Sequence, residues 1–117
     1  MYGWQGTILR VNLTSGKITK EPLNEDLAHK YIGSRGLNAK LLYDEVKPGT
    51  DPIGPDNKLI LGIGPACGTI SPGSQRWTAT CKATLSDFIS DGSCGSRFGS
   101  ALKYAGYDQL IIEGKSD

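Results

Sequence analysis

Glycine is the residue that most restricts what this 117-residue chain can fold into. Sixteen residues are glycine, and many of them gather in two clusters, within residues 62–73 and 92–99. Glycine weakens the interiors of helices and strands, but it permits backbone conformations and close approaches that side chains forbid. The two clusters therefore indicate turns, or places where a ligand approaches the backbone.

Apolar spacing and turn residues predict short elements around these clusters. The expected elements are a β-hairpin over residues 6–23, helices over 24–33 and 35–46, strands over 58–64 and 76–84, a helix over 98–105 and a strand over 109–114. Asn24 is placed to cap the first helix, and Gly33 and Gly106 are placed to end helices. Residues 47–57, 65–75 and 91–97 are expected to be loops. The order, with hairpins at the front and no regular βα alternation, predicts an α+β fold in one domain.

Composition excludes several classes of protein. The formal net charge is +1 and charged residues make up 21% of the chain, without the basic stripe of a nucleic-acid surface. No apolar run approaches the length of a membrane span, and the N-terminus lacks the pattern of a signal peptide. We therefore expect a cytoplasmic protein that binds neither nucleic acid nor membranes.

Three cysteines, Cys67, Cys81 and Cys94, lie more than ten residues apart. Without a C-x-x-C pair, the chain alone builds neither a zinc ribbon nor a complete iron–sulfur site. An odd number of cysteines also argues against a disulfide framework. We expect reduced, partly buried thiols.

No catalytic centre is evident from residue types and spacing. His29 is the single histidine and is expected at the surface, while Asp87, Asp91 and Asp108 are expected in turns. The stretch "GIGPACG" over residues 62–68 follows a strand, but its glycines are spaced one residue too far apart for a dinucleotide-binding loop. The following "TISPGS" does not open a helix.

An anion-binding site is the chemistry that the residues themselves favour. Arg76 opens a strand after a Gly/Ser-rich loop, and a guanidinium group suits bidentate contact with phosphate. The segment 92–95 ("GSCG") is expected to be a turn before a helix, whose free N–H groups would favour negative charge. One strand and a bend separate the two, so they are able to share one rim. Two interpretations stay open: a site for a phosphorylated ligand, or a glycine-rich connection beside a solvated arginine.

Four segments in order carry a resemblance to a known family: "GWQGTILRVNLTSGKI", "YIGSRGLNAKLLYDEV", "PDNKLILGIGPACGT" and "FGSALKYAGYDQLIIEGK". Together they cover nearly the whole chain and resemble the N-terminal domain of the aldehyde ferredoxin oxidoreductase family. The resemblance implies a β-rich base for a bis-pterin cofactor that carries tungsten or molybdenum. It also implies that residues 1–117 are the first part of that domain, one half of a pseudo-symmetric pair.

The resemblance assigns roles to three residues. Arg76 matches an arginine that contacts a pterin phosphate, and Gly95 matches a glycine where the backbone approaches the cofactor. Ser93 stands where the family usually has asparagine, whose main-chain carbonyl helps to hold a magnesium ion that bridges the pterin phosphates. "SRG" over residues 34–36 also matches, but no role for Arg35 follows.

For the parent enzyme, the resemblance implies oxidation of an aldehyde to a carboxylic acid. Electrons would pass through a [4Fe–4S] cluster, bound by other domains, to ferredoxin, and the enzyme would be a homodimer. The isolated chain is then expected to be inactive. Cys67 and Gln75 depart from the aldehyde-oxidising members, so a subunit of an aromatic acyl-CoA ring reductase is an alternative. A stand-alone pterin-binding or assembly module and a purely structural domain are two others.

Overall fold

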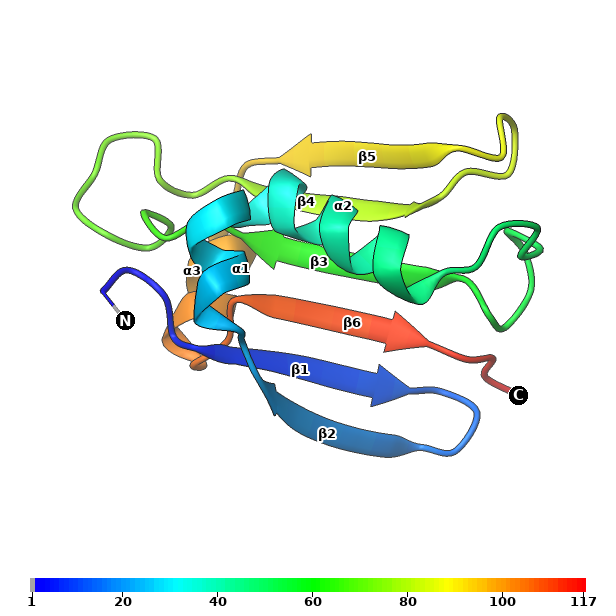
Figure 1. The fold of residues 1–117 in the computed structure, drawn as a ribbon. Coiled ribbons are helices and arrows are strands. Elements are labelled where there is room, and N and C mark those ends of the chain that lie inside the picture. Colours follow the sequence, from blue (N-terminus) through cyan, green and yellow to red (C-terminus); the bar gives the residue numbers. More distant parts are fainter. Residues whose placement is uncertain (1) are drawn as a thin grey trace.

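The short segments assemble into one six-stranded sheet with three helices (Figure 1). This is a computed structural model, and it describes residues 2–117. The elements are β1 (Thr7–Asn12), β2 (Lys17–Pro22), α1 (Glu25–Tyr31), α2 (Ser34–Glu45), β3 (Lys58–Ile63), β4 (Trp77–Lys82), β5 (Ile89–Cys94), α3 (Arg97–Tyr104) and β6 (Gln109–Glu113). The predicted α+β class is confirmed.

The strands lie in the order β2-β1-β6-β3-β4-β5. The hairpin β1–β2 is antiparallel, as are β3–β4 and β4–β5. The last strand, β6, lies between β1 and β3, parallel to the first and antiparallel to the second. The two ends of the chain are therefore joined in the middle of the sheet.

Strand β5 corrects the prediction of a loop over residues 91–97. Ile89–Cys94 pairs with β4 from Ile89 opposite Lys82 to Cys94 opposite Trp77. All six residues of β5 are exposed, because β5 is an edge strand. The predicted turn over 92–95 is therefore wrong for residues 92–94, and only Gly95 and Ser96 connect the strand to α3.

Helices α1 and α2 cover one face of the sheet. The Asn24 side chain accepts a hydrogen bond from the Leu27 N–H and caps α1, as predicted. The core on this face contains side chains of α2 and of the central strands, among them Leu37, Leu41, Ile60 and Ile111.

Asn38 of α2 is also fully buried in this core. Its amide Nδ2 donates to the carbonyl oxygens of Ile60 (3.2 Å) and Thr78 (2.9 Å) and to Thr80 Oγ1 (3.2 Å). A polar contact thus joins the middle of α2 to both β3 and β4.

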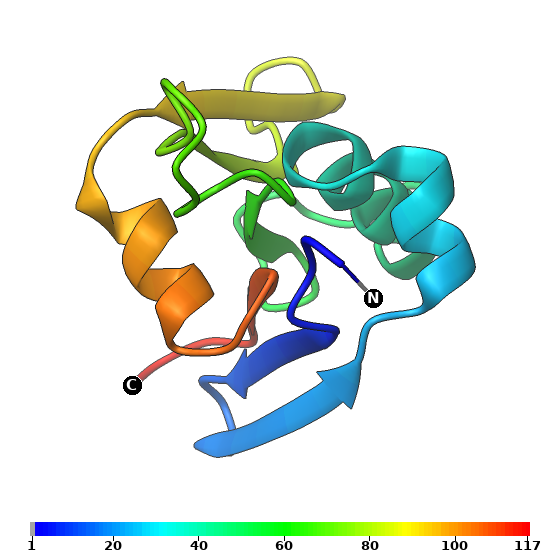
Figure 2. The same cartoon turned by 90° about the vertical axis from the view of Figure 1, so that its left-hand side faces the viewer.

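Helix α3 lies on the opposite face, as Figure 2 shows in a view along the strands, and it covers only the end of that face behind which it appears in Figure 1. Its Leu102 packs with Ile63 and Cys67, supported by Leu110. Because side chains alternate along a strand, Leu59 and Leu61 also point to this face. Leu61 is half-buried and Leu59 is 39% exposed, so much of this face carries apolar side chains without a covering element among residues 2–117.

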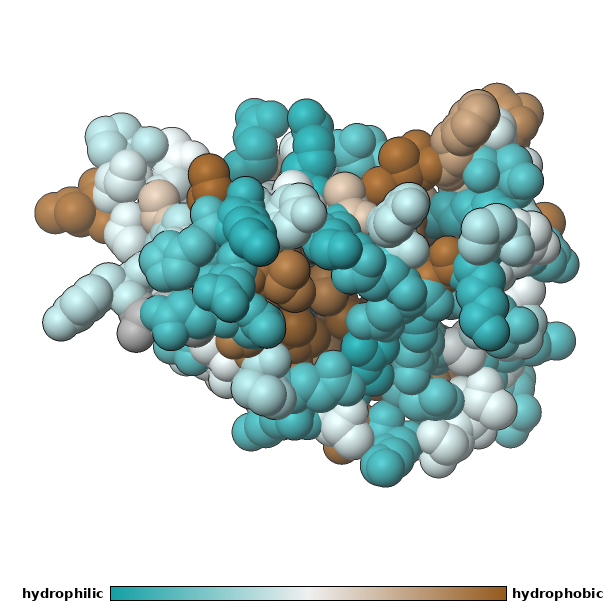
Figure 3. Space-filling view, in the orientation of Figure 1, coloured by the Kyte–Doolittle hydropathy of each residue, from teal (hydrophilic) through white to brown (hydrophobic). Residues whose placement is uncertain are grey.

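The face that carries α2 is mainly hydrophilic in Figure 3. Apolar side chains gather at its centre and at loop tips, where Ile70, Leu85 and Phe88 are exposed. Among residues 2–117, no helix is both long enough and apolar enough to cross a membrane.

Candidate functional site

The candidate site is a depression of about 580 Å³ where β3 and β5 end and β4 begins. The start of α2, the loop over residues 64–76 and the ends of these strands line it. The polar side chains that line it are Ser34, Arg35, Ser74, Arg76, Thr78 and Ser93. Two arginines and four hydroxyl groups make it chemically suited to an anion.

Arg76 reaches this depression from the end of the long loop. The Tyr104 hydroxyl of α3 donates to the Gly68 carbonyl (2.9 Å), and the Gly68 N–H donates to the Ser74 carbonyl (3.0 Å). A Cβ at Gly99 would lie 3.0 Å from Cys67 Sγ and 3.1 Å from the Gln75 carbonyl oxygen. Helix α3 therefore needs glycine at this position to pack closely against the loop that presents Arg76.

The three residues that the sequence proposed as a site lie at one end of the β4–β5 hairpin. Ser93 is opposite Thr78, and the next pair is Trp77 with Cys94. Arg76 directly precedes Trp77 in the sequence, and Gly95 directly follows Cys94. The structure thus brings Arg76 and Ser93 to the same depression, although through strand pairing and not through the predicted turn, and Gly95 follows two residues after Ser93.

Three hydroxyl groups form a chain across the floor of the depression. Ser34 Oγ is 2.9 Å from Thr78 Oγ1, which is 3.1 Å from Ser93 Oγ. Thr78 is 2% exposed, so its hydroxyl has few partners besides these two. The chain of hydroxyls connects α2, β4 and β5 and fixes the orientation of the Ser93 side chain.

The main-chain groups of Ser93 point away from β4. Ala83 and Phe88, the pair that follows Lys82 and Ile89 in this register, are hydrogen-bonded, since the Ala83 N–H donates to the Phe88 carbonyl. Hydrogen-bonded and non-hydrogen-bonded pairs alternate along antiparallel strands, so the Thr78–Ser93 pair is non-hydrogen-bonded. Because β5 is an edge strand, the Ser93 carbonyl oxygen faces the open side of the sheet, where it is able to accept from or coordinate a ligand.

Arg35 also lines the depression, and sequence reasoning gave it no role. It is the second residue of α2, and its Nε donates to Asp91 Oδ2 of β5 at 2.5 Å. Asp91 therefore lies in a strand and not in the predicted turn. The one signal in the sequence for a role of Arg35 was its position directly after "GS" at the start of a helix. No pattern linked Arg35 to Asp91, because strand β5 was not predicted.

The other titratable residues considered from the sequence, Asp108, His29 and Asp87, lie outside the depression. Asp108 is 1% exposed and accepts from the N–H groups of Gln5 (3.1 Å) and Gly6 (2.8 Å), so it anchors the N-terminal segment. His29 is exposed beside Glu25, as expected for a surface residue. Asp87 does lie in a turn, where it pairs with Lys82.

The three cysteines are free thiols, and they differ in exposure. Cys94 is exposed, Cys81 is intermediate, and Cys67 is buried beside the depression. Burial raises the pKa of the Cys67 thiol, against a smaller opposing effect of Lys103. The prediction of partly buried thiols therefore holds for Cys81 and is wrong for Cys94.

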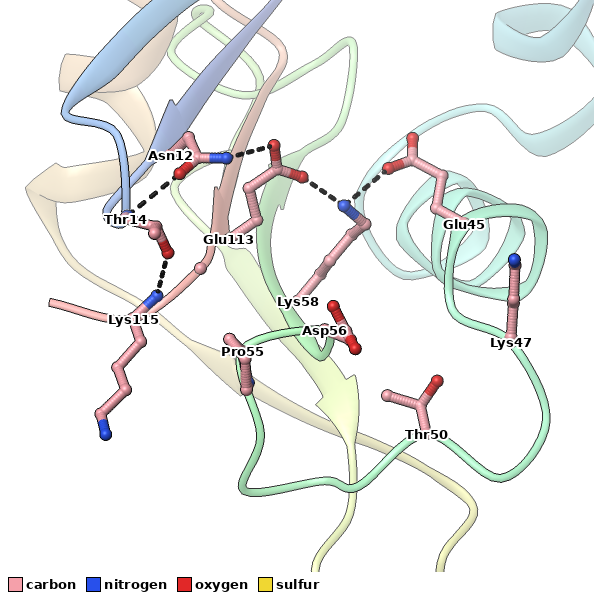
Figure 4. A pocket seen from close by; sticks show the side chains of 11 residues that line it. Asn12, Thr14, Glu45, Lys47, Thr50, Pro55, Asp56, Lys58, Glu113 and Lys115 are labelled. Carbon is pink, nitrogen blue, oxygen red and sulfur yellow. Dashed lines mark hydrogen bonds and ion pairs between the residues drawn. The ribbon is translucent and has the colours of Figure 1, made fainter.

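A larger depression, of about 770 Å³, lies at the opposite end of the sheet (Figure 4). Its central charges are already paired: Lys58 bonds to Glu113 and lies 3.5 Å from Glu45. Arg10 makes further ion pairs to Glu45 and Glu113. Although burial raises the pKa of Glu113, contacts with Lys58 and Arg10 outweigh it and hold that pKa below its ordinary value.

Pairing distinguishes the two depressions. Among residues 2–117, Arg76 forms no hydrogen bond or ion pair within its own chain, whereas Arg10 and Lys58 are held by carboxylates. An unpaired guanidinium beside hydroxyl groups is available to a ligand, and a neutralised network is not. The smaller depression is therefore the candidate binding site.

Comparison with known proteins identifies relatives of the whole chain. Residues 8–117 match the family described as "Aldehyde ferredoxin oxidoreductase, N-terminal domain". The tungsten-containing aldehyde ferredoxin oxidoreductase of Pyrococcus furiosus is 45% identical over 117 residues, and that of Thermococcus kodakarensis is 44% identical. An aliphatic sulfonate oxidoreductase, WOR-like subunit, of Pyrococcus furiosus is 35% identical over 119 residues. All 117 residues align with each of the two aldehyde enzymes, but they span only 19% of those proteins.

A solved structure shares the fold. The active-site complex BamBC of benzoyl coenzyme A reductase, in complex with 1,5-dienoyl-CoA, matches with a TM-score of 0.95 and 36% identity. The match covers 98% of this chain and 18% of that one.

Proposed function

The chain belongs to the aldehyde ferredoxin oxidoreductase family, as an N-terminal domain, and we propose that its smaller depression binds the phosphate of a tungsten- or molybdenum-carrying pterin cofactor. The observation that carries the proposal is Arg76, whose guanidinium is without a partner among residues 2–117 and lines this depression. Ser93, which lines the same depression, and Gly95, which directly follows β5, are the two other residues that the family resemblance selects.

The residues present fit a phosphorylated ligand. Arg76 would hold phosphate oxygens through charge-assisted hydrogen bonds. The ideal Cβ position of Gly95 has no atom within 4 Å, so a ligand is able to approach the backbone there. The outward carbonyl of Ser93 would serve as a main-chain oxygen ligand for magnesium, a cation that binds oxygen atoms and commonly takes phosphate oxygens among its ligands. When bound, the metal and its pterin dithiolenes supply the redox chemistry, and this domain binds and orients them.

The chain is proposed to be the first part of a larger cofactor-binding domain, one half of a pseudo-symmetric pair. Its relatives are more than five times as long, since the chain spans 19% of them. The apolar sheet face that α3 leaves open, with Leu59 and Leu61, supports a continuation that packs there.

The whole enzyme is proposed to oxidise aldehydes to carboxylic acids in the cytoplasm. A [4Fe–4S] cluster in other domains would pass electrons to ferredoxin, and the enzyme would form a homodimer. The 45% identity to tungsten-containing aldehyde ferredoxin oxidoreductases favours this substrate class. The match to benzoyl coenzyme A reductase, at 36% identity, favours reduction of an aromatic acyl-CoA as the second candidate.

The test replaces Arg76 by alanine in the complete metalloenzyme, purified without oxygen. Loss of a charge-assisted contact, of about 1.5–3 kcal/mol, should lower cofactor affinity by about one to two decades. Tungsten, molybdenum and pterin per protein would be measured beside activity with an aldehyde. Normal cofactor content with lost activity would contradict the anchoring role of Arg76.

Gly95→Val tests the close approach of the cofactor. The open space at Gly95 means that the variant should fold normally, so a loss of bound cofactor would come from obstruction of the ligand. Gly92→Val is the matched control, because Gly92 also has open space and lies on the same chain segment in β5. Equal cofactor content in the two variants would show that Gly95 is not at the cofactor. Ser93→Asn should be tolerated, because the proposed contact uses the main chain.

A further inference from the structure

We propose that Arg35 is a second phosphate-binding residue of the depression, and that Asp91 holds its guanidinium in position. The inference rests on the proposed function, because it concerns the same site. It adds a residue from a different segment, since Arg35 belongs to α2 and Arg76 to the loop that ends before β4.

The hydrogen bonding of Arg35 leaves most of its guanidinium free. Only Nε is engaged within residues 2–117, by Asp91 Oδ2 at 2.5 Å. A guanidinium carries five N–H donors, so four remain on the two terminal nitrogens. These terminal nitrogens form the face that binds phosphate in a bidentate manner.

The exposed fractions of the two side chains indicate that Asp91 is held by the sheet and that Arg35 is accessible to a ligand. The Asp91 side chain is 29% exposed, whereas the Arg35 side chain is 68% exposed and lines the depression. Asp91 is attached to β5, whose pairing with β4 fixes its backbone opposite Thr80. A carboxylate held on the sheet thus orients a guanidinium that is otherwise free to rotate in solvent.

The hydroxyl chain places the start of α2 against the same site. Ser34, the residue before Arg35, bonds to Thr78 and through it to Ser93. The backbone at Arg35 is therefore tied to both strands that carry the proposed cofactor contacts. A phosphate group bound there would meet Arg76 and the terminal nitrogens of Arg35 together, and Arg35, Arg76 and Asp91 carry a net charge of one positive unit.

The experiment measures binding of inorganic phosphate to the 117-residue chain by nuclear magnetic resonance at low ionic strength. The side-chain Nε–H signals of Arg35 and Arg76 report each guanidinium separately. We expect both signals to shift saturably with phosphate. Arg35→Gln should weaken binding by about tenfold, the lower end for a charge-assisted contact. Lys17→Gln removes the same charge from the first residue of β2 and should change affinity less than twofold.

Two variants of Asp91 separate positioning from competition. Asp91→Asn keeps an oxygen that accepts from Arg35 Nε and removes a negative charge, so phosphate binding should be retained or strengthened. Asp91→Ala leaves Arg35 unsupported and should weaken binding. Stronger binding by Asp91→Ala would overturn the positioning role, since it would mean that Asp91 competes with phosphate for Arg35.

The outcomes distinguish this inference from the proposed function. If Arg76→Gln abolishes phosphate binding and Arg35→Gln leaves it unchanged, the role of Arg35 is refuted and the proposed cofactor site stands. A wild-type chain without any saturable response at either arginine contradicts both. Unchanged amide signals in the core of each variant confirm that the fold is intact.

Discussion

Gly62→Ala should destabilise the fold through one side chain, Asn38. A Cβ at Gly62 would lie 2.0 Å from Asn38 Oδ1 and 2.8 Å from Asn38 Cγ, far inside contact distance. Asn38 is fully buried and has no room to move without losing its hydrogen bonds. The added methyl group therefore acts by displacing the amide that joins α2 to β3 and β4.

The size of the effect follows from those hydrogen bonds. The two N–H groups of Nδ2 serve three acceptors, on Ile60, Thr78 and Thr80. Losing about two hydrogen bonds at about 1 kcal/mol each, and leaving a buried acceptor unpaired at about 1–3 kcal/mol, totals about 3–5 kcal/mol. Replacing glycine by alanine in a strand returns only about 0.5–1 kcal/mol.

The assay is urea unfolding followed by circular dichroism, in a double-mutant cycle with Asn38→Ala. Without the Asn38 side chain the new methyl group no longer meets it, so Gly62→Ala should cost less than about 1 kcal/mol in that background. The coupling free energy should then be at least about 1.5 kcal/mol, within the range for residues in contact. Additive effects of the two substitutions would refute the argument, because they would show that the methyl group does not act on Asn38.

Two further predictions concern titration and thiol reactivity. Although burial raises the pKa of Glu113, contacts with Lys58 and Arg10 hold it below the ordinary 4.5. The ionised Glu113 side chain therefore stabilises the fold fully above that pH, and this stabilisation is lost as pH falls through the lowered pKa. Glu113→Gln should be less stable at neutral pH and should lose less further stability on acidification, measured by urea unfolding at several pH values; a parallel pH dependence would contradict this. Iodoacetamide should modify exposed Cys94 well before Cys67, whose burial raises its pKa, as read by mass spectrometry of tryptic peptides; equal rates would mean that the thiol of Cys67 is accessible.

The elements that the sequence predicted correctly are those with a strong local signal. The apolar pattern and the Asn24 cap located α1, and the apolar runs located β3 and β6. The position of β6 between β1 and β3 was not predicted, because pairing between residues about a hundred positions apart leaves no local pattern. The alternation over residues 76–84 predicted β4, but not that its threonine face would be the buried one.

Strand β5 shows why part of the site was described wrongly. A strand is recognised by alternating burial, and every residue of β5 is exposed, so "ISDGSC" has no apolar period. Its glycine and serine residues have low strand propensity, and pairing with β4 overrides it. The same omission hid the Arg35–Asp91 pair, since Asp91 was expected in a turn. Arg76 and Ser93 were nevertheless placed at one site, because the connection between β4 and β5 is short whether or not β5 is a strand.

The two ends of the sheet differ in how their charges are satisfied, and this difference determines where a ligand is able to bind. At the end where β6 finishes, Arg10 and Lys58 are neutralised by carboxylates from β2, α2 and β6, so that end stabilises the fold. At the other end, Arg76 has no carboxylate partner among residues 2–117, and Arg35 is paired with Asp91 through Nε alone, so its terminal nitrogens stay free. A guanidinium without a carboxylate partner gains electrostatic stabilisation when an anion binds to it. The charge distribution therefore favours an anionic ligand at the end where β3 and β5 terminate, the same end that α3 and the glycine-rich loop shape.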